Sequence, residues 1–476
     1  MFSNELWQKS GVSTYSIDQS IRFNQSDSAY LTKTFGGSAS NRRTHTYSFW
    51  LKLGANAAGA NSSGGCFFIS TDDSGGNAGD YFHLNGDLKL RYWSNESSAS
   101  TFETTQLFRD FSAWYHIVLV NDRDNAVGSE AVRLYVNGQR VTSFAVNNIS
   151  GRKSQDTMVN ASSFLWMIQR FTSGTVHGDA YMAEIVFLDG TATDCNSFGE
   201  FNDSGIWIPK DVSGLTSGTN GFHIDGRDSA DLGDDESGNG NDYTASGLAA
   251  HDQVSDSPTN NFAVLNPVDT HGKLAGELRN GNLELKDNGA SVYVYGRATF
   301  GFDVTDSNGF YWESCDVVDG SGIGGITEDN TALPSGSSLA FTGARGYNSL
   351  NTSNHYKLEN TTFASVDLGV ASNAGDIVQF CVKNGKLFIG INGTYVLSGN
   401  PATEANPLFT GLTGIFMPFA GLYSAVSYNT VYNFGQDGTF AGNKTAQGNT
   451  DANDNGNFFY APPSGAKALC SKSLGS

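Results

Sequence analysis

The sequence predicts an all-β fold made of two antiparallel β-sandwiches in tandem. Short apolar-rich stretches separated by turn signals recur along the chain, and Phe, Tyr and Gly are plentiful, which favours strands and turns over helices. Two stretches of similar design, 114–141 and 375–396, each contain apolar strands and an Asn-Gly pair, at 137–138 and at 392–393. Asn-Gly accepts the positive φ angles of a type I′ turn. Two such hairpins so far apart in 476 residues predict two separate sandwiches.

The first sandwich is predicted over residues 15–205, after an N-terminal attachment segment at 1–14. Residues 46–53 alternate polar and apolar side chains, so Tyr47 and Phe49 are expected on the same face of a strand. Turn signals follow about every 8–12 residues, which is typical of a sandwich.

The next stretch, 206–275, changes character. Between Asp225 and Asp256 there are nine acidic residues, and only Arg227 opposes them. Apolar residues also become sparse here. We therefore expect an acidic, irregular connector between the two sandwiches.

The second sandwich is predicted over 276–476, including a C-terminal tail. Residues 309–317 form a strong strand pattern, and the glycine-spaced strand 322–326 indicates close approach of another backbone or an aromatic ring. The hairpin at 375–396 belongs to this unit.

The net charge of −20 limits the partners. A chain this acidic repels nucleic-acid phosphates and anionic membrane surfaces, so we expect neither nucleic-acid binding nor membrane insertion. The N-terminal stretch has no apolar run typical of a signal peptide. Five widely spaced cysteines show no metal-ligand spacing and are expected as buried thiols formed in a reducing cytoplasm: Cys66, Cys195, Cys315, Cys381 and Cys470.

Catalytic motifs find little support, and we expect no enzymatic activity. A retaining glycosidase needs two carboxyl groups about 5–5.5 Å apart, whereas Glu184 is the only acid in the strand pattern 180–188. His116 lies in a strand pattern and is expected to be a packed residue rather than a base. A hydrolase assembled from residues far apart in sequence stays open as an alternative.

Aromatic side chains near predicted loops are the candidate ligand-binding residues. Tyr92, Trp93 and Trp207 are the three whose positions favour a binding platform over the core. Most other strand aromatics are expected in the core.

One acidic turn is the candidate metal site, with Ca²⁺ as the possible cofactor. The segment 234–242 offers several oxygen ligands, and its glycines allow a tight bend. The candidate ligands are Asp235, Asn239, Asn241 and Asp242. A solvated Asn/Gly-rich turn is the alternative. Loop acids at Asp72, Asp73 and Asp122 are a second candidate for calcium at a sandwich rim.

The first unit resembles the laminin-G/concanavalin A-like lectin superfamily. The resemblance rests on four stretches: 48–52, 114–118, 134–138 and 178–187. It implies a jelly-roll sandwich over about residues 15–200.

The second unit resembles the SPRY domain, a related sandwich. The matching stretches are 310–313, 322–324, 375–378, 387–393, 418–420 and 433–435. The link at 383–385 is shorter than is usual in that family.

The pairing of these two sandwiches resembles virion fibre, spike or capsid decoration proteins of tailed phages, with similar stretches at 257–263 and 462–470. The resemblance implies a non-enzymatic virion surface protein made in the host cytoplasm. Its expected partners are other virion proteins and a host surface glycan or protein, and fibres and spikes are usually homotrimers. A cellular carbohydrate-binding or adhesion module is the alternative.

Overall fold

The computed structural model describes the greater part of the chain as two compact units, Met1–Thr259 and Asn260–Ser476. The residues described are 15–35, 41–57, 65–72, 78–94, 100–171, 176–271, 278–286, 293–318, 322–331, 343–351, 354–360, 362–370, 373–423 and 428–474. Both units consist of antiparallel sheets, which confirms the predicted fold class. The predicted attachment segment, 1–14, lies outside the described residues.

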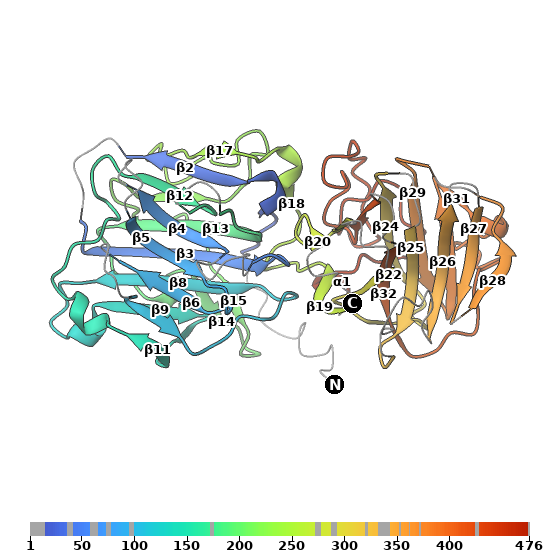
Figure 1. The fold of residues 1–476 in the computed structure, drawn as a ribbon, viewed down its shortest axis with the longest axis horizontal. Helices are drawn as coiled ribbons and strands as arrows, with labels where there is room; N and C mark the ends of the chain where they lie inside the picture. Colours follow the sequence, from blue (N-terminus) through green and yellow to red (C-terminus); the bar gives the residue numbers. More distant parts are fainter. Residues whose placement is uncertain are drawn as a thin grey trace. The chain divides into compact units, whose positions relative to one another are not determined.

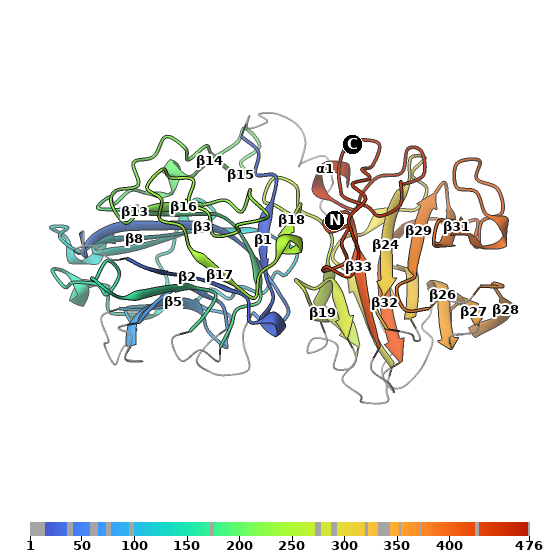
Figure 2. The same cartoon turned by 90° about the horizontal axis from the view of Figure 1, so that it is seen from above.

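The first unit is built from two large sheets stacked face to face (Figures 1 and 2). Sheet A has the order β10 (Gln139–Arg140), β9 (Val132–Val136), β8 (Tyr115–Asp122), β3 (Thr44–Leu53), β13 (Ala180–Asp189), β1 (Ser20–Phe23) and β18 (Gln253–Val254), with β16 (Phe222–Ile224) beside β13. Sheet B has the order β11 (Phe144–Asn147), β7 (Phe102–Thr104), β6 (Leu90–Trp93), β5 (Ala78–Leu84), β4 (Phe67–Asp72), β12 (Leu165–Ile168), β2 (Tyr30–Thr34) and β17 (Thr244–Ser246). A separate ribbon joins β14 (Gly199–Phe201) to β15 (Trp207–Pro209).

Aromatic rings fill the space between sheets A and B. Phe49 of β3 lies 4.7 Å from Phe68 of β4, centroid to centroid, and Trp166 meets Phe187 edge to face at 5.0 Å. Phe49, Phe68, Trp166 and Phe187 are fully buried. Burying a side chain of this size contributes about 1.5–3 kcal/mol, so these rings stabilise the core together with its many aliphatic side chains.

The predicted acidic connector is folded, and the boundary between the units falls at 259/260 rather than within a linker. Residues 206–259 supply β15, β16, β17 and β18, and Phe222 and Tyr243 enter the core between the sheets. The sequence prediction failed here because the strands are only two or three residues long and three of them, β16, β17 and β18, pair with strands that come earlier in the chain.

The same segment covers the outer face of sheet A. A second apolar cluster includes Trp50 and Tyr181 of sheet A and Trp114 just before β8, together with Trp207 of this segment and Phe198 before it. Sheet A is therefore buried on both faces, which explains why β3 and β13 are buried along almost their whole length.

A buried ion pair fixes the end of this covering segment. Asp256 Oδ2 lies 2.6 Å from Lys52 Nζ of β3, and both side chains are 0% exposed. Trp114 Nε1 donates to the other carboxylate oxygen at 3.0 Å. A paired, hydrogen-bonded charge of this kind specifies one position for the segment on the sheet.

The second unit also stacks two sheets. Sheet C has the order β19 (Leu265–His271), β22 (Tyr293–Ala298), β32 (Ile415–Tyr423), β25 (Gly322–Glu328), β26 (Ala344–Asn351), β27 (Asn354–Glu359) and β28 (Thr362–Asp367), with β23 (Phe302–Asp303) beside β32. Sheet D has the order β20 (Leu278–Arg279), β21 (Glu284–Lys286), β33 (Asn429–Asn433), β24 (Phe310–Asp316), β29 (Ile377–Lys383), β30 (Lys386–Ile391) and β31 (Thr394–Tyr395). The unit begins at Asn260, earlier than the predicted residue 276.

Ring stacking also forms the core of the second unit. Trp312 and Phe380, paired across β24 and β29, stack at 5.1 Å, and Tyr347 of sheet C lies 5.9 Å from Phe380. A Cβ added at Gly324 would lie 3.0 Å from the Phe380 ring. This close approach confirms the prediction for the glycine-spaced strand.

A long irregular segment closes the outer face of sheet D. Phe458, Ala468 and Cys470 pack with Phe262 and Tyr311. The carboxylate of buried Glu313 accepts hydrogen bonds from the backbone N–H groups of residues 459 and 460, from a tyrosine hydroxyl and from an asparagine amide. Burial nevertheless raises the pKa of Glu313 to about 7.

The predicted Asn-Gly turns are confirmed. Asn137 and Gly138 have φ angles of 48° and 76°, and Asn392 and Gly393 have 49° and 82°. Each pair closes a tight hairpin, β9–β10 and β30–β31. All five cysteines are buried and free, as predicted.

Helices are short throughout the described chain. They are the 3-10 turns η2 (Gln25–Asp27), η3 (Gly128–Glu130), η4 (Ile149–Arg152), η5 (Cys195–Ser197), η6 (Ala250–Asp252) and η8 (Val396–Ser398), and α1 (Ser471–Leu474). None of these helices has the length and apolar character that crossing a membrane requires.

Candidate functional site

The outer face of sheet B carries a mixed aromatic and charged surface. Leu90 and Tyr92 of β6 point into the core, so strand alternation places Arg91 and Trp93 on the opposite, outer face. Both outer side chains are half-buried. We call the group formed by Tyr81, Arg91, Trp93, Ser100 and Glu103 the Trp93 face.

Cation–π and hydrogen-bond contacts fix the rings of the Trp93 face. The Arg91 guanidinium lies 4.6 Å from the centre of the Trp93 ring. The Trp93 indole N–H donates to Ser100 Oγ, and Tyr81 packs edge-on at 6.4 Å. The indole is therefore held in one orientation, with its polar edge satisfied.

Charged and amide groups lie beside this ring. Glu103 Oε1 is 3.3 Å from Lys89 Nζ, and Glu103 Oε2 accepts a hydrogen bond from Asn85 Nδ2 at 3.2 Å. Arg91 Nε is 3.7 Å from the same carboxylate. A fixed ring next to directional donors and acceptors suits a ligand that has apolar C–H faces and hydroxyl groups, such as a sugar.

Tyr92, one of the predicted ligand residues, lies on the inner side of the same strand. Its side chain is 1% exposed and packs in the core. Its hydroxyl donates to Asp80 and receives a hydrogen bond from Arg123, each at 3.4 Å. The Tyr92 ring therefore has no face open to a ligand in this structure, whereas Trp93 is half-buried, and ligand binding at Trp93 stays a prediction.

Trp207, the third predicted ligand residue, is 8% exposed and packs on sheet A. Its indole N–H donates to His116 Nδ1 at 3.0 Å. A Cβ at Gly138 or Gly199 would lie within 2.5 Å of the indole. Glycine at these two positions therefore makes room for the ring, and its contacts are those of a structural anchor.

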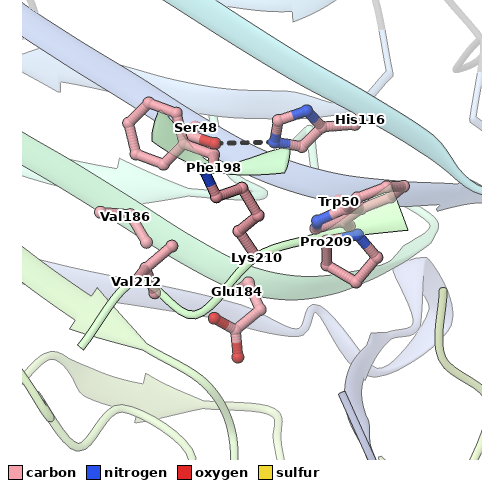
Figure 3. A pocket seen from close by; sticks show the side chains of 9 residues that line it. All are labelled: Ser48, Trp50, His116, Glu184, Val186, Phe198, Pro209, Lys210 and Val212. Atoms are coloured by element: carbon pink, nitrogen blue, oxygen red, sulfur yellow. Dashed lines mark hydrogen bonds between the residues drawn. The ribbon is translucent and has the colours of Figure 1, made fainter. Parts of the chain in front are cut away.

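Ser48 and His116 line a small pocket under the covering segment (Figure 3). Ser48 Oγ and His116 Nε2 are 2.9 Å apart, a separation typical of a serine–histidine pair. The pocket also includes Glu184, whose carboxylate points away from this pair in Figure 3. It has no room for a water molecule.

A catalytic histidine accepts the hydrogen bond of its serine, whereas His116 donates to Ser48. Because Nδ1 accepts the Trp207 N–H, the neutral imidazole carries its proton on Nε2 and donates it to Ser48. Burial lowers the pKa of His116 to about 3. The imidazole therefore leaves the serine unactivated, and His116 is a packed residue, as predicted.

The predicted calcium turn at 234–242 is held by its own hydrogen bonds. Asp235 Oδ1 accepts from the backbone N–H groups of His223 and Ser237, and Oδ2 accepts from Asn241 N and Ser237 Oγ. Asp242 Oδ1 accepts from Asp235 N. Both oxygens of Asp235 thus face donors, an arrangement that holds a turn without a cation.

The two asparagines of this turn point to a neighbouring loop. Asn239 Nδ2 donates to carbonyl groups at 218 and 221, and Asn241 Nδ2 to those at 219 and 221. The structure therefore brings the four predicted metal residues into one turn but gives them a structural role, and calcium at this turn stays a prediction. Of the rim candidates, Asp122 pairs with Arg133 at 3.1 Å, and Asp73 lies outside the described residues.

Sequence reasoning missed Arg91 and Glu103 of the Trp93 face. The signal for Arg91 was available, because residues two apart on a strand share a face and Arg91 therefore lies on the same face as Trp93. Glu103 was not accessible in this way, since its place depends on the pairing of β7 with β6.

Comparisons with known proteins give one family match. Residues 24–183 match the concanavalin A-like lectin/glucanases superfamily. No curated protein sequence matches the chain.

Similar solved structures include two SPRY domains and a laminin fragment. The SPRY domain of human HERC1 has 13% identity, covers 35% of this chain and 96% of its own, and gives a TM-score of 0.25. The PSpry domain of TRIM65 has 12% identity, coverages of 36% and 88%, and a TM-score of 0.25. Domains LG4-5 of the mouse laminin alpha1 chain have 10% identity, coverages of 88% and 95%, and a TM-score of 0.27. The family match shows that residues 24–183 of the first unit are similar to concanavalin A-like lectin domains.

Proposed function

We propose that this protein is a surface-attachment protein whose first unit binds a glycan on the Trp93 face. The lectin-type domain supports the class of function. The observation that carries the location is the fixed Trp93 ring on the outer face of sheet B, beside Arg91 and Glu103.

The chemistry of the Trp93 face fits a neutral or acidic sugar. The C–H face of a pyranose packs on the indole, while the guanidinium and the Glu103 carboxylate bond its hydroxyl groups. Arg91 also offers a charge to a carboxylated sugar. Affinity for one site of this size is expected to be weak, so several copies on one particle would strengthen attachment through avidity.

A glycan array that carries bacterial surface polysaccharides and animal glycans tests the site, with affinities of the hits measured by calorimetry on the full chain. Trp93→Ala is expected to weaken binding about 10-fold or more, because it removes roughly 1.5–3 kcal/mol of ring contact. Phe201→Ala is the matched control, since Phe201 is an exposed aromatic, at 46%, outside the Trp93 face. Equal loss in both variants, or unchanged binding in Trp93→Ala, refutes the site.

We further propose that the chain works on the surface of a tailed-phage particle, as a fibre, spike or decoration protein and as a homotrimer. This step rests on the resemblance of its two-sandwich arrangement and of the stretches 257–263 and 462–470 to such proteins. Its partners would be other virion proteins and a host surface glycan or protein. Purified particles should contain the chain in a multiple of three copies, and its absence from particles would contradict the assignment.

A cellular carbohydrate-binding or adhesion module is the second candidate. The lectin-domain match favours it equally, because a fold of this kind does not specify where the protein is displayed. Recovery of the chain from cell envelopes without phage particles would favour this candidate.

A further inference from the structure

Three side chains with metal-ligating atoms meet on the first unit, away from the Trp93 face. They are Glu184 of β13, His223 of β16 and Asp225, which follows β16. One ligand atom from each lies within 4.8 Å of the others. The antiparallel pairing of β16 with β13, with His223 opposite Val186, brings them together across 39 residues of sequence.

The separation between two of the groups already suits a shared ion. His223 Nε2 and Glu184 Oε2 are 3.1 Å apart. With zinc bonds of about 2.0–2.2 Å, neighbouring ligands of a tetrahedral site lie roughly 3.3–3.5 Å apart. The ligand atom of Asp225 lies within 4.8 Å of both and makes a three-residue set.

Asp225 has an oxygen suited to a cation. The residue is 2% exposed, and its Oδ2 accepts no hydrogen bond among the described residues. That oxygen lies 2.9 Å from Nη2 of Arg227, whose side chain is 65% exposed. The present counter-charge of a buried carboxylate is therefore a solvent-exposed guanidinium, which an ion can displace at small cost.

The surroundings also favour positive charge. Three carboxylates, those of Glu184, Asp225 and Glu236, act electrostatically on His223. Glu184 also holds a hydrogen bond from the Tyr15 hydroxyl, which fixes its carboxylate. Ligands oriented by further hydrogen bonds are typical of metal sites.

We propose that Glu184, His223 and Asp225 bind one divalent transition-metal ion, with zinc the best match to the ligand set. Imidazole suits zinc, whereas calcium and magnesium take oxygen ligands. Water completes the coordination. The ion would link β13 to the segment after β16, and so hold the covering chain on sheet A. This site is independent of the proposed glycan function.

Calorimetric titration of the metal-free full chain with ZnCl₂ tests the site. We expect one zinc ion per chain, weaker binding of CaCl₂ and MgCl₂, and a rise in melting temperature on the order of 5 °C at saturating zinc. His223→Gln and Glu184→Gln should each lower zinc affinity about 10-fold or more. His251→Gln is the matched control, because His251 also lies beside one carboxylate, at 3.8 Å from Asp252, and should leave zinc affinity unchanged.

For Arg227→Gln we expect zinc affinity to rise rather than fall. Because the Arg227 side chain is exposed, this variant does not depend on how well a variant of a buried ligand folds. Removing the exposed guanidinium frees Asp225 Oδ2, so zinc affinity should rise several-fold. A purely structural Glu184–His223 contact predicts no zinc binding in any variant. Absence of zinc binding by the wild-type chain, zinc binding unchanged in Glu184→Gln, or weaker binding in Arg227→Gln overturns the proposal.

Discussion

Asp256→Ala tests whether the acidic segment 206–259 is an integral part of the first unit. The substitution removes the carboxylate that lies 2.6 Å from Lys52 Nζ and accepts the Trp114 indole N–H at 3.0 Å. Lys52 and Asp256 are both fully buried. The buried Lys52 ammonium loses its nearest carboxylate and the Trp114 indole N–H loses its acceptor, so we expect a loss of about 3–5 kcal/mol in the free energy of unfolding.

Urea unfolding followed by tryptophan fluorescence measures this loss. Six of the seven tryptophans lie within Met1–Thr259, so the signal reports mainly on the first unit of the full chain. The midpoint should fall with little change in the slope of the transition, because the same surface is exposed on unfolding.

A second substitution separates charge burial from simple loss of contact. Lys52→Met in the Asp256→Ala background removes the buried ammonium itself, so the double variant should be more stable than the sum of single effects predicts, by about 1–3 kcal/mol. A loss below about 1 kcal/mol in Asp256→Ala, or additivity within about 0.5 kcal/mol, would show that the pair does not hold the segment.

Three further predictions concern other anchors. Glu313→Gln turns an amide NH₂ toward two of the four donors and should lower the free energy of unfolding by about 2–4 kcal/mol. The backbone amides of residues 458–460 should then exchange hydrogen faster. Burial raises the pKa of Glu313 to about 7 from its usual 4.5, so the folded state holds more protons than the unfolded state between these values. The stability advantage of the wild type over Glu313→Gln should therefore be largest at and below about pH 4.5 and shrink as the pH rises to about 7, as melting curves across this range will show; a constant difference refutes it. Asp235→Ala leaves four donors without their acceptor and should cost about 2–4 kcal/mol by urea unfolding, and an unchanged midpoint would contradict the role of Asp235 as the centre of the turn. Trp207→Phe removes the donor to His116 and should cost about 1–3 kcal/mol, while the same unfolding midpoint as the wild type would show that the contact contributes nothing.

Most of the architecture could be predicted from local pattern. Strand alternation predicts the strands, and the Asn-Gly pairs at 137–138 and 392–393 predict tight turns. The structure has both. The domain boundary could not be predicted in this way. In 206–259 the strands are short, and what places them is a set of distant partners, such as Lys52 for Asp256.

The candidate site was predictable only in part. The position of Trp93 followed from sequence, but the inward direction of Tyr92 required the phase of β6 relative to the core. The cluster of Glu184, His223 and Asp225 was out of reach, because sequence composition does not indicate which strand lies beside β13.

The way in which the second unit is closed has a consequence for its modularity. Its first and last segments lie side by side, because Phe262 forms an antiparallel β-bridge with Cys470. The backbone N–H of Ala263 donates to the carbonyl of Leu469, and that of Ser471 donates to the carbonyl of Asn261. A domain with adjacent entry and exit points can be transplanted into a surface loop of an unrelated host protein without stretching either junction. Such a cassette suits recombination between genes, and it offers a ready scaffold for grafting new recognition loops.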